Sequence, residues 1–281
     1  MPRTSFDTRM HGFAFANTFE FDEAERQHLR KIFARYLLWG GVLGAVVGGL
    51  LGVLLVPFFI PGAVVLGLIG AILVPLCILA LRKQLESHLA PHYGLCGGMC
   101  FAALDFYSAN RPIPRGQGTN DQPAPGTRLH GYIWKRQMAS IFSDGARFTA
   151  WLISLNYVPP ARPFGGGPAW LLARSKKEWK KLKTSVDAGR AVPIGLVRDA
   201  KNVYDNHQVL AIGYDDGDEA QGTVHLYDPN CPDRESTVRI HFGEQLLDGR
   251  ESCGAAAPLR GFFCEVYTPA DPGDAVEQPG G

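Results

Sequence analysis

The sequence predicts an α+β protein in which helices are followed by an antiparallel sheet, with a two-helix transmembrane hairpin ahead of this domain. Two observations predict this class. Two long apolar runs without charge lie within residues 37–81, and the chain beyond them changes from helical apolar spacing to short β-rich segments. We therefore expect an N-terminal segment (1–36), a hairpin (37–83), a folded domain (84–268) and a disordered tail rich in Pro and Gly (269–281).

Composition limits the classes of function. The chain has 281 residues, a formal net charge of +1 and 46% hydrophobic residues. This length accommodates one compact domain and an appendage. The balanced charge provides no basic field for a phosphate backbone, so nucleic acid is not an expected partner. The six cysteines stand in a long chain whose first residues lack the pattern of a signal peptide, which favours reduced thiols.

The apolar stretch predicts two membrane-spanning helices. Residues 37–59 and 63–81 each approach the roughly 20 residues that cross the hydrocarbon core, and a Pro-Gly turn at 60–62 reverses the chain between them. Basic residues flank both outer ends, whereas the turn has none. The positive-inside bias predicts a multi-pass protein that contacts the lipid bilayer through residues 37–81, with both termini and the catalytic domain cytoplasmic.

A glycine recurs at every fourth position of the first apolar run, at Gly40, Gly44, Gly48 and Gly52. A helix face without side chains lets another helix approach closely. This glycine strip faces the second helix of the hairpin, another copy in a homo-oligomer, or a pore. Packing within the hairpin is the favoured reading, and the alternatives stay open.

The folded domain is expected to begin with helices. The turn GLCGG precedes the helical pattern MCFAALDFY, so Cys96 lies at the start of a helix. Further helical spacing is found in GYIWKRQMASIF, ARFTAWLISL and AWLLARSKKEWKKLKTSV. From Ala191 the pattern predicts five strands: PIGLV, HQVLAIGY, TVHLYDP, TVRIHF and GFFCEVY.

Three residues have the positions that thiol catalysis requires. A thiol at a helix N-terminus, as expected for Cys96, has its thiolate stabilised by the partial positive charge there, and a neighbouring histidine completes the activation. His207 begins one expected strand and Asp228 ends the next. Because adjacent antiparallel strands can place such residues side by side, we expect His207 and Asp228 to be neighbours.

Four short motifs occur in order along residues 94–230: CGGMCFAALDFYSAN, AGRAVPIGLV, NHQVLAIGY and LYDPN. They resemble the nucleophile helix, the segment before the histidine strand, the histidine strand and the Asp-Pro motif of papain-like cysteine peptidases, especially the peptidase domains of bacteriocin exporters. The resemblance implies a papain-like hydrolase domain. It also implies that Cys96 attacks a carbonyl carbon, His207 takes and returns the proton, and Asp228 holds the imidazole tautomer.

The sequence departs from this family at the oxyanion donor. Papain-like enzymes place a glutamine six residues before the cysteine, but Ala90 occupies that position. Gln84 lies further upstream. His92, Tyr93 or backbone amides near Cys96 are the alternatives, since donors of several kinds can bind an oxyanion.

The register of the nucleophile is also open. Cys100 is followed by Phe101-Ala102, as the papain cysteine is followed by an aromatic residue and alanine. Cys96 is favoured because Cys-Gly fits the exporter-like group and lies nearer the helix start. A zinc site is not favoured, because the remaining cysteines lack compact pair spacing.

We therefore predict a membrane-anchored cysteine hydrolase, a thiol peptidase that cleaves or modifies amide bonds in a peptide or protein substrate without a cofactor. Deamidation and acyl transfer use the same triad and stay open. One alternative is a catalytically inactive papain-like binding module anchored in the membrane. Another is an oligomerising glycine-rich hairpin that the soluble domain regulates.

Overall fold

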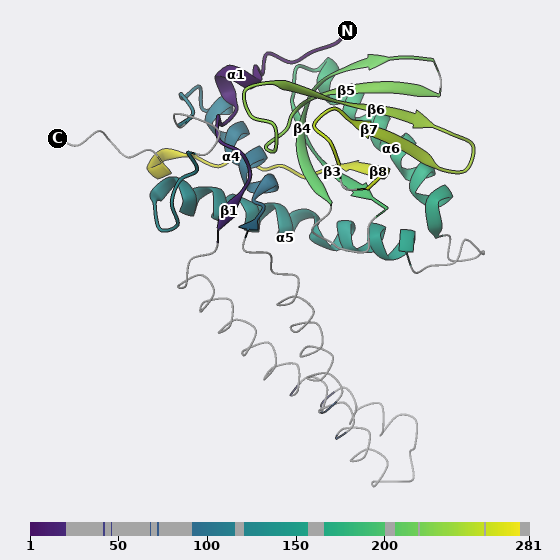
Figure 1. Ribbon diagram of the computed structural model, residues 1–281, viewed down its shortest axis with the longest axis horizontal. Coiled ribbons are helices and arrows are strands. Elements are labelled where there is room, and N and C mark those ends of the chain that lie inside the picture. Colours follow the sequence, from purple (N-terminus) through teal and green to yellow (C-terminus); the bar gives the residue numbers. More distant parts are fainter. Residues whose placement is uncertain are drawn as a thin grey trace, which may run out of the picture. The chain divides into compact units, whose positions relative to one another are not determined.

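The computed structural model describes residues 1–20, 92–115, 121–156, 166–199, 206–218, 220–255 and 257–275, with the single positions 42, 46, 68 and 72. The chain divides into two compact units, Met1–Phe19 with Gly94–Gly281, and Glu20–Tyr93. The first unit contains the helices and the barrel discussed below (Figure 1). Two short strands, β1 (Phe19–Glu20) and β2 (His92–Tyr93), form a two-stranded sheet.

The helices of the first unit are α1 (Thr8–His11), α4 (Cys96–Ser108), α5 (Arg128–Asn156) and α6 (Gly167–Asp187). Helix α4 packs mainly on α5 and also on β4 (His207–Asp216), as Figure 1 shows. Proline in the first turn of α6 suits the N-terminus, where its missing N–H costs no helical hydrogen bond. Gly189, at a φ of +73°, then turns the chain from α6 towards the strands.

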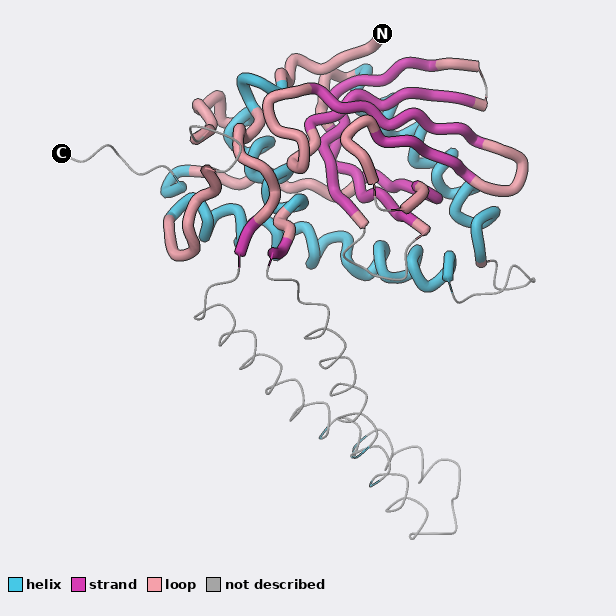
Figure 2. The backbone as a smooth tube through the Cα atoms, in the orientation of Figure 1, coloured by secondary structure: helices cyan, strands magenta, loops and turns pink. Residues whose placement is uncertain are grey.

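Six antiparallel strands form a closed barrel (Figure 2). They are β3 (Val192–Arg198), β4, β5 (Gln221–Tyr227), β6 (Glu235–Phe242), β7 (Leu247–Glu251) and β8 (Leu259–Cys264). Each strand pairs with the next, and β8 returns to pair with β3. The 3-10 turn η2 (Gly273–Ala275) follows the barrel.

This barrel corrects the predicted fold class. The prediction was a papain-like domain of helices followed by an antiparallel sheet, and it included five strands. The missing strand is β7, whose sequence LDGRE has little β-propensity and a central glycine. Because β7 pairs with both β6 and β8, it joins the two strands that would otherwise be sheet edges and closes the barrel.

The predicted membrane localisation is corrected as well. Within the described ranges, the structure has no helix of the length and apolar character needed to cross a bilayer. The predicted hairpin at 37–83, including the glycine strip, lies outside the described residues apart from four positions. The two-span localisation, with its cytoplasmic catalytic domain, and the description as a membrane thiol protease are therefore not retained.

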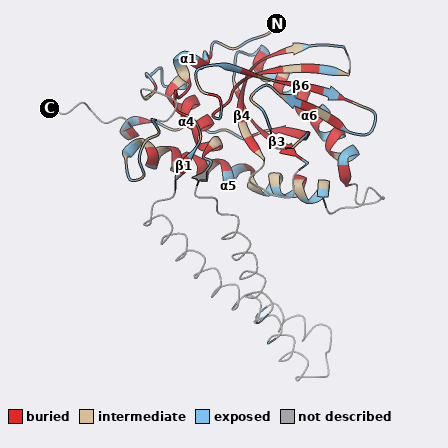
Figure 3. Cartoon of the chain, viewed as in Figure 1, coloured by how far each residue is buried: buried red, intermediate tan, exposed pale blue. Residues whose placement is uncertain are grey.

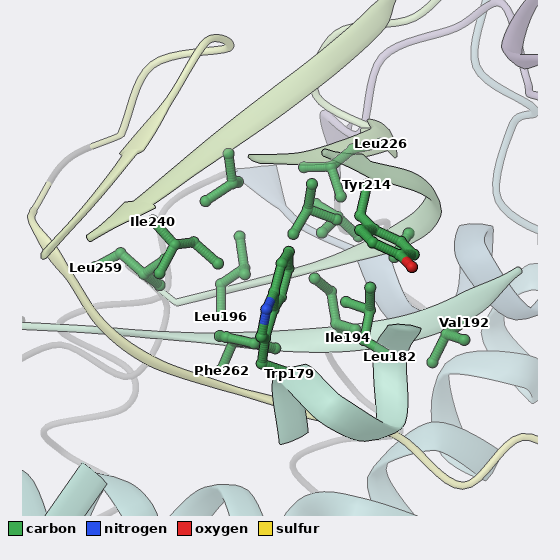
Figure 4. Close-up of a cluster of buried hydrophobic side chains, with 14 of the residues drawn as sticks. Trp179, Leu182, Val192, Ile194, Leu196, Tyr214, Leu226, Ile240, Leu259 and Phe262 are labelled. Atoms are coloured by element: carbon green, nitrogen blue, oxygen red, sulfur yellow. The ribbon is translucent and has the colours of Figure 1, made fainter. Parts of the chain in front are cut away.

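The main hydrophobic core fills the barrel and extends to α6. Trp179 of α6 lies among inward-facing side chains of several strands, and Figure 4 shows it at the centre of this cluster. Its ring is in tilted or edge contact with Tyr214, Phe242 and Phe262. Strand β5 has Gly222 at this point, where a Cβ would lie 2.6 Å from the Trp179 ring. The barrel thus depends on α6 for part of its core.

The first nineteen residues belong to the same unit as the barrel. The backbone of Thr4 donates to Ile212, and Tyr214 donates to Pro2, so the N-terminal residues run along β4. Phe13 and Phe15 are fully buried, and the buried residues of α4 and the barrel are red in Figure 3. This segment is therefore part of the folded core.

A disulfide joins Cys231, which follows β5, to Cys253, which follows β7, with a Cα–Cα distance of 6.0 Å. The expectation of reduced thiols is wrong for this pair. The two cysteines are 22 positions apart in the sequence, and the folding of the barrel brings them close together. Cys96, Cys100 and Cys264 are free.

Removing the disulfide should destabilise the fold. Because the bond closes a loop with a sequence separation of 22, loss of the constraint on the unfolded chain is expected to lower the free energy of unfolding by about 3 kcal/mol. The measurement is urea unfolding of the double variant Cys231→Ser/Cys253→Ser. The single variant Cys264→Ser is the control, and an equal loss in both variants would contradict the assignment.

Candidate active site

Helix α4 begins at Cys96 in an unusually close packing environment. A Cβ at Gly97 would lie 2.1 Å from Gln208 Oε1, and a Cβ at Gly98 would lie 2.3 Å from the carbonyl oxygen of Ile133. At position 98 only glycine permits this approach, because the close atom belongs to the α5 backbone, whereas at position 97 the side chains of Gln208 and Ser140 would have to move. The packing places the Cys96 side chain next to the first residues of β4.

His207 and Asp228 form the second part of the site. In the β4–β5 ladder Leu210 pairs with Tyr227, so continuing the register places Asp228, which follows β5, opposite Val209. His207 lies two residues further along β4, on the same face of the strand, and is therefore a diagonal neighbour of Asp228. His207 Nε2 is 2.8 Å from Asp228 Oδ1, and the two side chains are only 4% and 2% exposed. The expected neighbours thus form a buried pair.

Cys96 contacts the same imidazole. Its side chain is within hydrogen-bonding reach of His207, and since Nε2 is paired with Asp228, Nδ1 is the nitrogen left for the thiol. Burial opposes the charged form of His207, but the charge and hydrogen bond of Asp228, followed by Cys96, raise the pKa of His207 to about 10. For Asp228, burial acts in the opposite direction, yet His207 and the Asn230 amide keep its pKa below the usual value. The structure therefore brings the three predicted residues together around a charged imidazole.

The alternative nucleophile Cys100 has a different environment. It is fully buried one turn into α4, and its thiol donates to the backbone carbonyl of Gln208 at 3.7 Å. Burial, and then the charge of Cys96, raise the pKa of Cys100 well above its ordinary value. Cys96 is partly exposed, so the geometry favours Cys96 as the reactive thiol.

Sequence reasoning missed a polar cluster beneath the thiol. Gln208 Nε2 donates to Glu265 Oε1 at 2.5 Å and to Ser140 Oγ at 3.4 Å, which turns its Oε1 towards Cys96 at 3.9 Å. Burial raises the pKa of Glu265 to about 8, so this carboxyl group is largely protonated at neutral pH. A glutamine in an otherwise apolar strand was the available signal, but nothing in the sequence indicated its partners.

This cluster extends to a cavity of about 530 Å³, of which Glu265 forms part of the lining. The other lining residues come from α5, α6, β3, β8 and the chain after β8, and include Arg147, Lys180, Lys181, Thr184 and Cys264. Cys96, His207 and Asp228 are not among the lining residues, so the cavity is linked to the thiol only through the hydrogen bond of Glu265 with Gln208.

Asn17 was also missed, and it connects the two parts of the site. Its Oδ1 accepts the N–H of Leu95 at 2.5 Å, directly before Cys96, and its Nδ2 donates to Asn230 Oδ1 at 3.1 Å. The Asn17 backbone N–H donates to Pro229 at 3.0 Å. The side chain thus joins the start of α4 to the turn that holds Asp228. No sequence motif marked this residue, because it lies 79 positions before the cysteine.

The other oxyanion donors suggested by the sequence, the side chains of His92 and Tyr93, lie outside the described part of the chain. Ala90 lies outside it as well. Across the described residues, no group of three or more His, Cys, Asp or Glu side chains is arranged to hold a metal ion.

Comparison with known proteins returns no matching family model, no matching curated protein and no matching solved structure. The fold and the site together define a six-stranded barrel protein with a Cys-His-Asp constellation at the start of a helix.

The pKa of His207 can be tested by histidine NMR titration. We expect the His207 pKa to be about 10 in the wild-type protein. Asp228→Asn should lower it more than Cys96→Ser, because Asp228 raises the pKa more strongly than Cys96 does. The control Asp248→Asn, in β7, should leave it unchanged.

The same shift determines a pH dependence of stability. Since the native pKa lies above the ordinary value of 6.5, the folded protein holds a proton that the unfolded chain releases between pH 6.5 and about 10. The free energy of unfolding should fall across this window more steeply in the wild type than in His207→Gln. The free energy of unfolding is measured by urea unfolding at each pH. If its dependence on pH is the same in the wild type and in His207→Gln, the raised pKa of His207 is contradicted.

Proposed function

We propose that this protein is a cysteine hydrolase that cleaves or modifies amide bonds, with Cys96 as nucleophile, His207 as proton carrier and Asp228 as the group that orients the imidazole. The observation that carries the proposal is the contact of a partly exposed thiol, at a helix start, with a buried imidazole whose other nitrogen is held by a carboxylate. An imidazolium and a helix N-terminus both favour the thiolate, which is the nucleophilic form.

In the proposed reaction the Cys96 thiolate forms a bond to the amide carbon, and the carbonyl π electrons move to oxygen. The tetrahedral oxyanion then collapses, the carbonyl re-forms and the C–N bond breaks. The departing nitrogen takes the proton of the His207 imidazolium, which leaves a thioester on Cys96. A water molecule then gives a proton to His207, and its oxygen attacks the thioester, which releases the carboxylic acid product and the thiolate.

A peptide or protein amide is the proposed substrate, and transfer to an amine in place of water would use the same thioester. Asp228 contributes by holding Nε2, so that Nδ1 stays directed at the thiol.

Alkylation of the thiols tests the proposal without a known substrate. At a limiting dose of iodoacetamide and neutral pH, Cys96 should be labelled first, as mapped by mass spectrometry. His207→Ala should slow this labelling by about 100-fold, because the imidazolium that favours the thiolate is lost.

His241→Ala, which removes an exposed histidine of β6, is the matched control and should leave the rate unchanged. Slow labelling of all free cysteines, unaffected by His207→Ala, would contradict the proposal and favour a catalytically inactive binding module. Preferential labelling of Cys100 would contradict the assignment of the nucleophile.

A further inference from the structure

The proposed reaction creates an oxyanion, and the start of α4 provides backbone donors for it. The first N–H groups of a helix have no helical acceptor. In α4 the N–H of Met99 is bonded to the Leu95 carbonyl and that of Gly98 to Gln137 Oε1, at 2.8 Å each. Within the described ranges no group accepts from the N–H of Cys96, so this donor is free beside the thiol.

Two glutamines lie near the thiol, but their side-chain amide nitrogens are bonded to other residues, so neither supplies a second donor to an oxyanion. The amide nitrogen of Gln208 is held by Glu265 and Ser140, so its oxygen faces Cys96. Gln137 uses its oxygen on Gly98 and its nitrogen on Gln208. An acceptor atom facing the thiol would repel an oxyanion.

Asn17 has the opposite orientation. Because its Oδ1 must accept the N–H of Leu95, its Nδ2 is fixed as the outward group. One Nδ2 proton is used on Asn230, and no group of the described residues accepts the second. Nδ2 also lies close to the backbone before the thiol, since a Cβ at Gly94 would be only 2.9 Å from it.

We propose that the Asn17 side-chain amide and the backbone N–H of Cys96 together form the oxyanion hole of this site. This inference rests on the proposed function. It assigns a catalytic role to the segment Met1–Phe19, which reaches the site through its packing along β4. Anchoring of Asn17 to Leu95, Pro229 and Asn230 holds the donor in place before the charge develops, which is the condition for strong stabilisation.

Two reactions of the same thiol separate this role from thiol activation. Acylation by p-nitrophenyl acetate passes through an oxyanion before p-nitrophenolate leaves. Alkylation by iodoacetamide forms the sulfur–carbon bond as iodide leaves, and no oxyanion arises. The readout is the ratio of the acylation rate constant to the alkylation rate constant at Cys96.

Asn17→Asp keeps an acceptor for Leu95 and removes the donor, and Asn17→Ala removes both without adding charge. We expect each to lower the ratio by about 100-fold relative to the wild type. Asn156→Asp, on the exposed end of α5, is the matched control and should keep the wild-type ratio.

A fall of at least tenfold in both Asn17 variants supports the assignment. A smaller change overturns it, whether the two rate constants stay constant or fall together, because equal losses would mean that Asn17 only supports the fold around the thiol. Failure of the proposed function itself is seen separately, as alkylation of wild-type Cys96 that does not depend on His207.

Discussion

The geometry of the site depends on how closely α4 approaches β4 and α5. Gly97 and Gly98 face Gln208 and Ile133 at distances that leave no space for a Cβ, so one added methyl group at either position would have to move the helix or its neighbours. A moved helix would separate Cys96 from His207, whose position is set independently by the barrel ladder. The two glycines after the cysteine therefore have a packing role, and the contact between thiol and imidazole follows from it.

Around this contact the hydrogen bonds form a closed ring. Cys96 contacts His207, His207 pairs with Asp228, and the N–H of Asn230 donates to the same Asp228 oxygen at 2.9 Å. Asn230 then accepts from Asn17, which returns to the residue before Cys96. Four segments of the chain, at Asn17, at Leu95–Cys96, at His207 and at Asp228–Asn230, thus share one network. Because the members of such a network support one another, a change at any of them is expected to affect the others.

Cys96, His207 and Asp228 could be predicted from the sequence, because a helix start and two consecutive strands are recognisable as local patterns. These patterns place the thiol at a helix N-terminus and the other two residues on neighbouring strands. His207 and Asp228 come close together because β4 and β5 are adjacent strands, although the register makes them diagonal neighbours and not a directly opposed pair. Strand β7 was missed because its charged, glycine-containing sequence carries no β-pattern, and without it the closed barrel was not foreseen. Asn17 meets Leu95 and Asn230, and Gln208 meets Glu265, only through tertiary packing, which leaves no sequence spacing to detect. The position of Cys253 near Cys231 has the same origin.

The disulfide lies next to the turn on which the site depends. The backbone N–H of Cys231 donates to the carbonyl of Asp228 at 2.9 Å, so the bonded cysteine ends the turn that begins with Asp228, the partner of His207. Tying Cys231 to the end of β7 restricts the opening of this turn, and opening would leave Asp228 hydrated and His207 without its partner. A buried imidazolium that loses its carboxylate is strongly disfavoured.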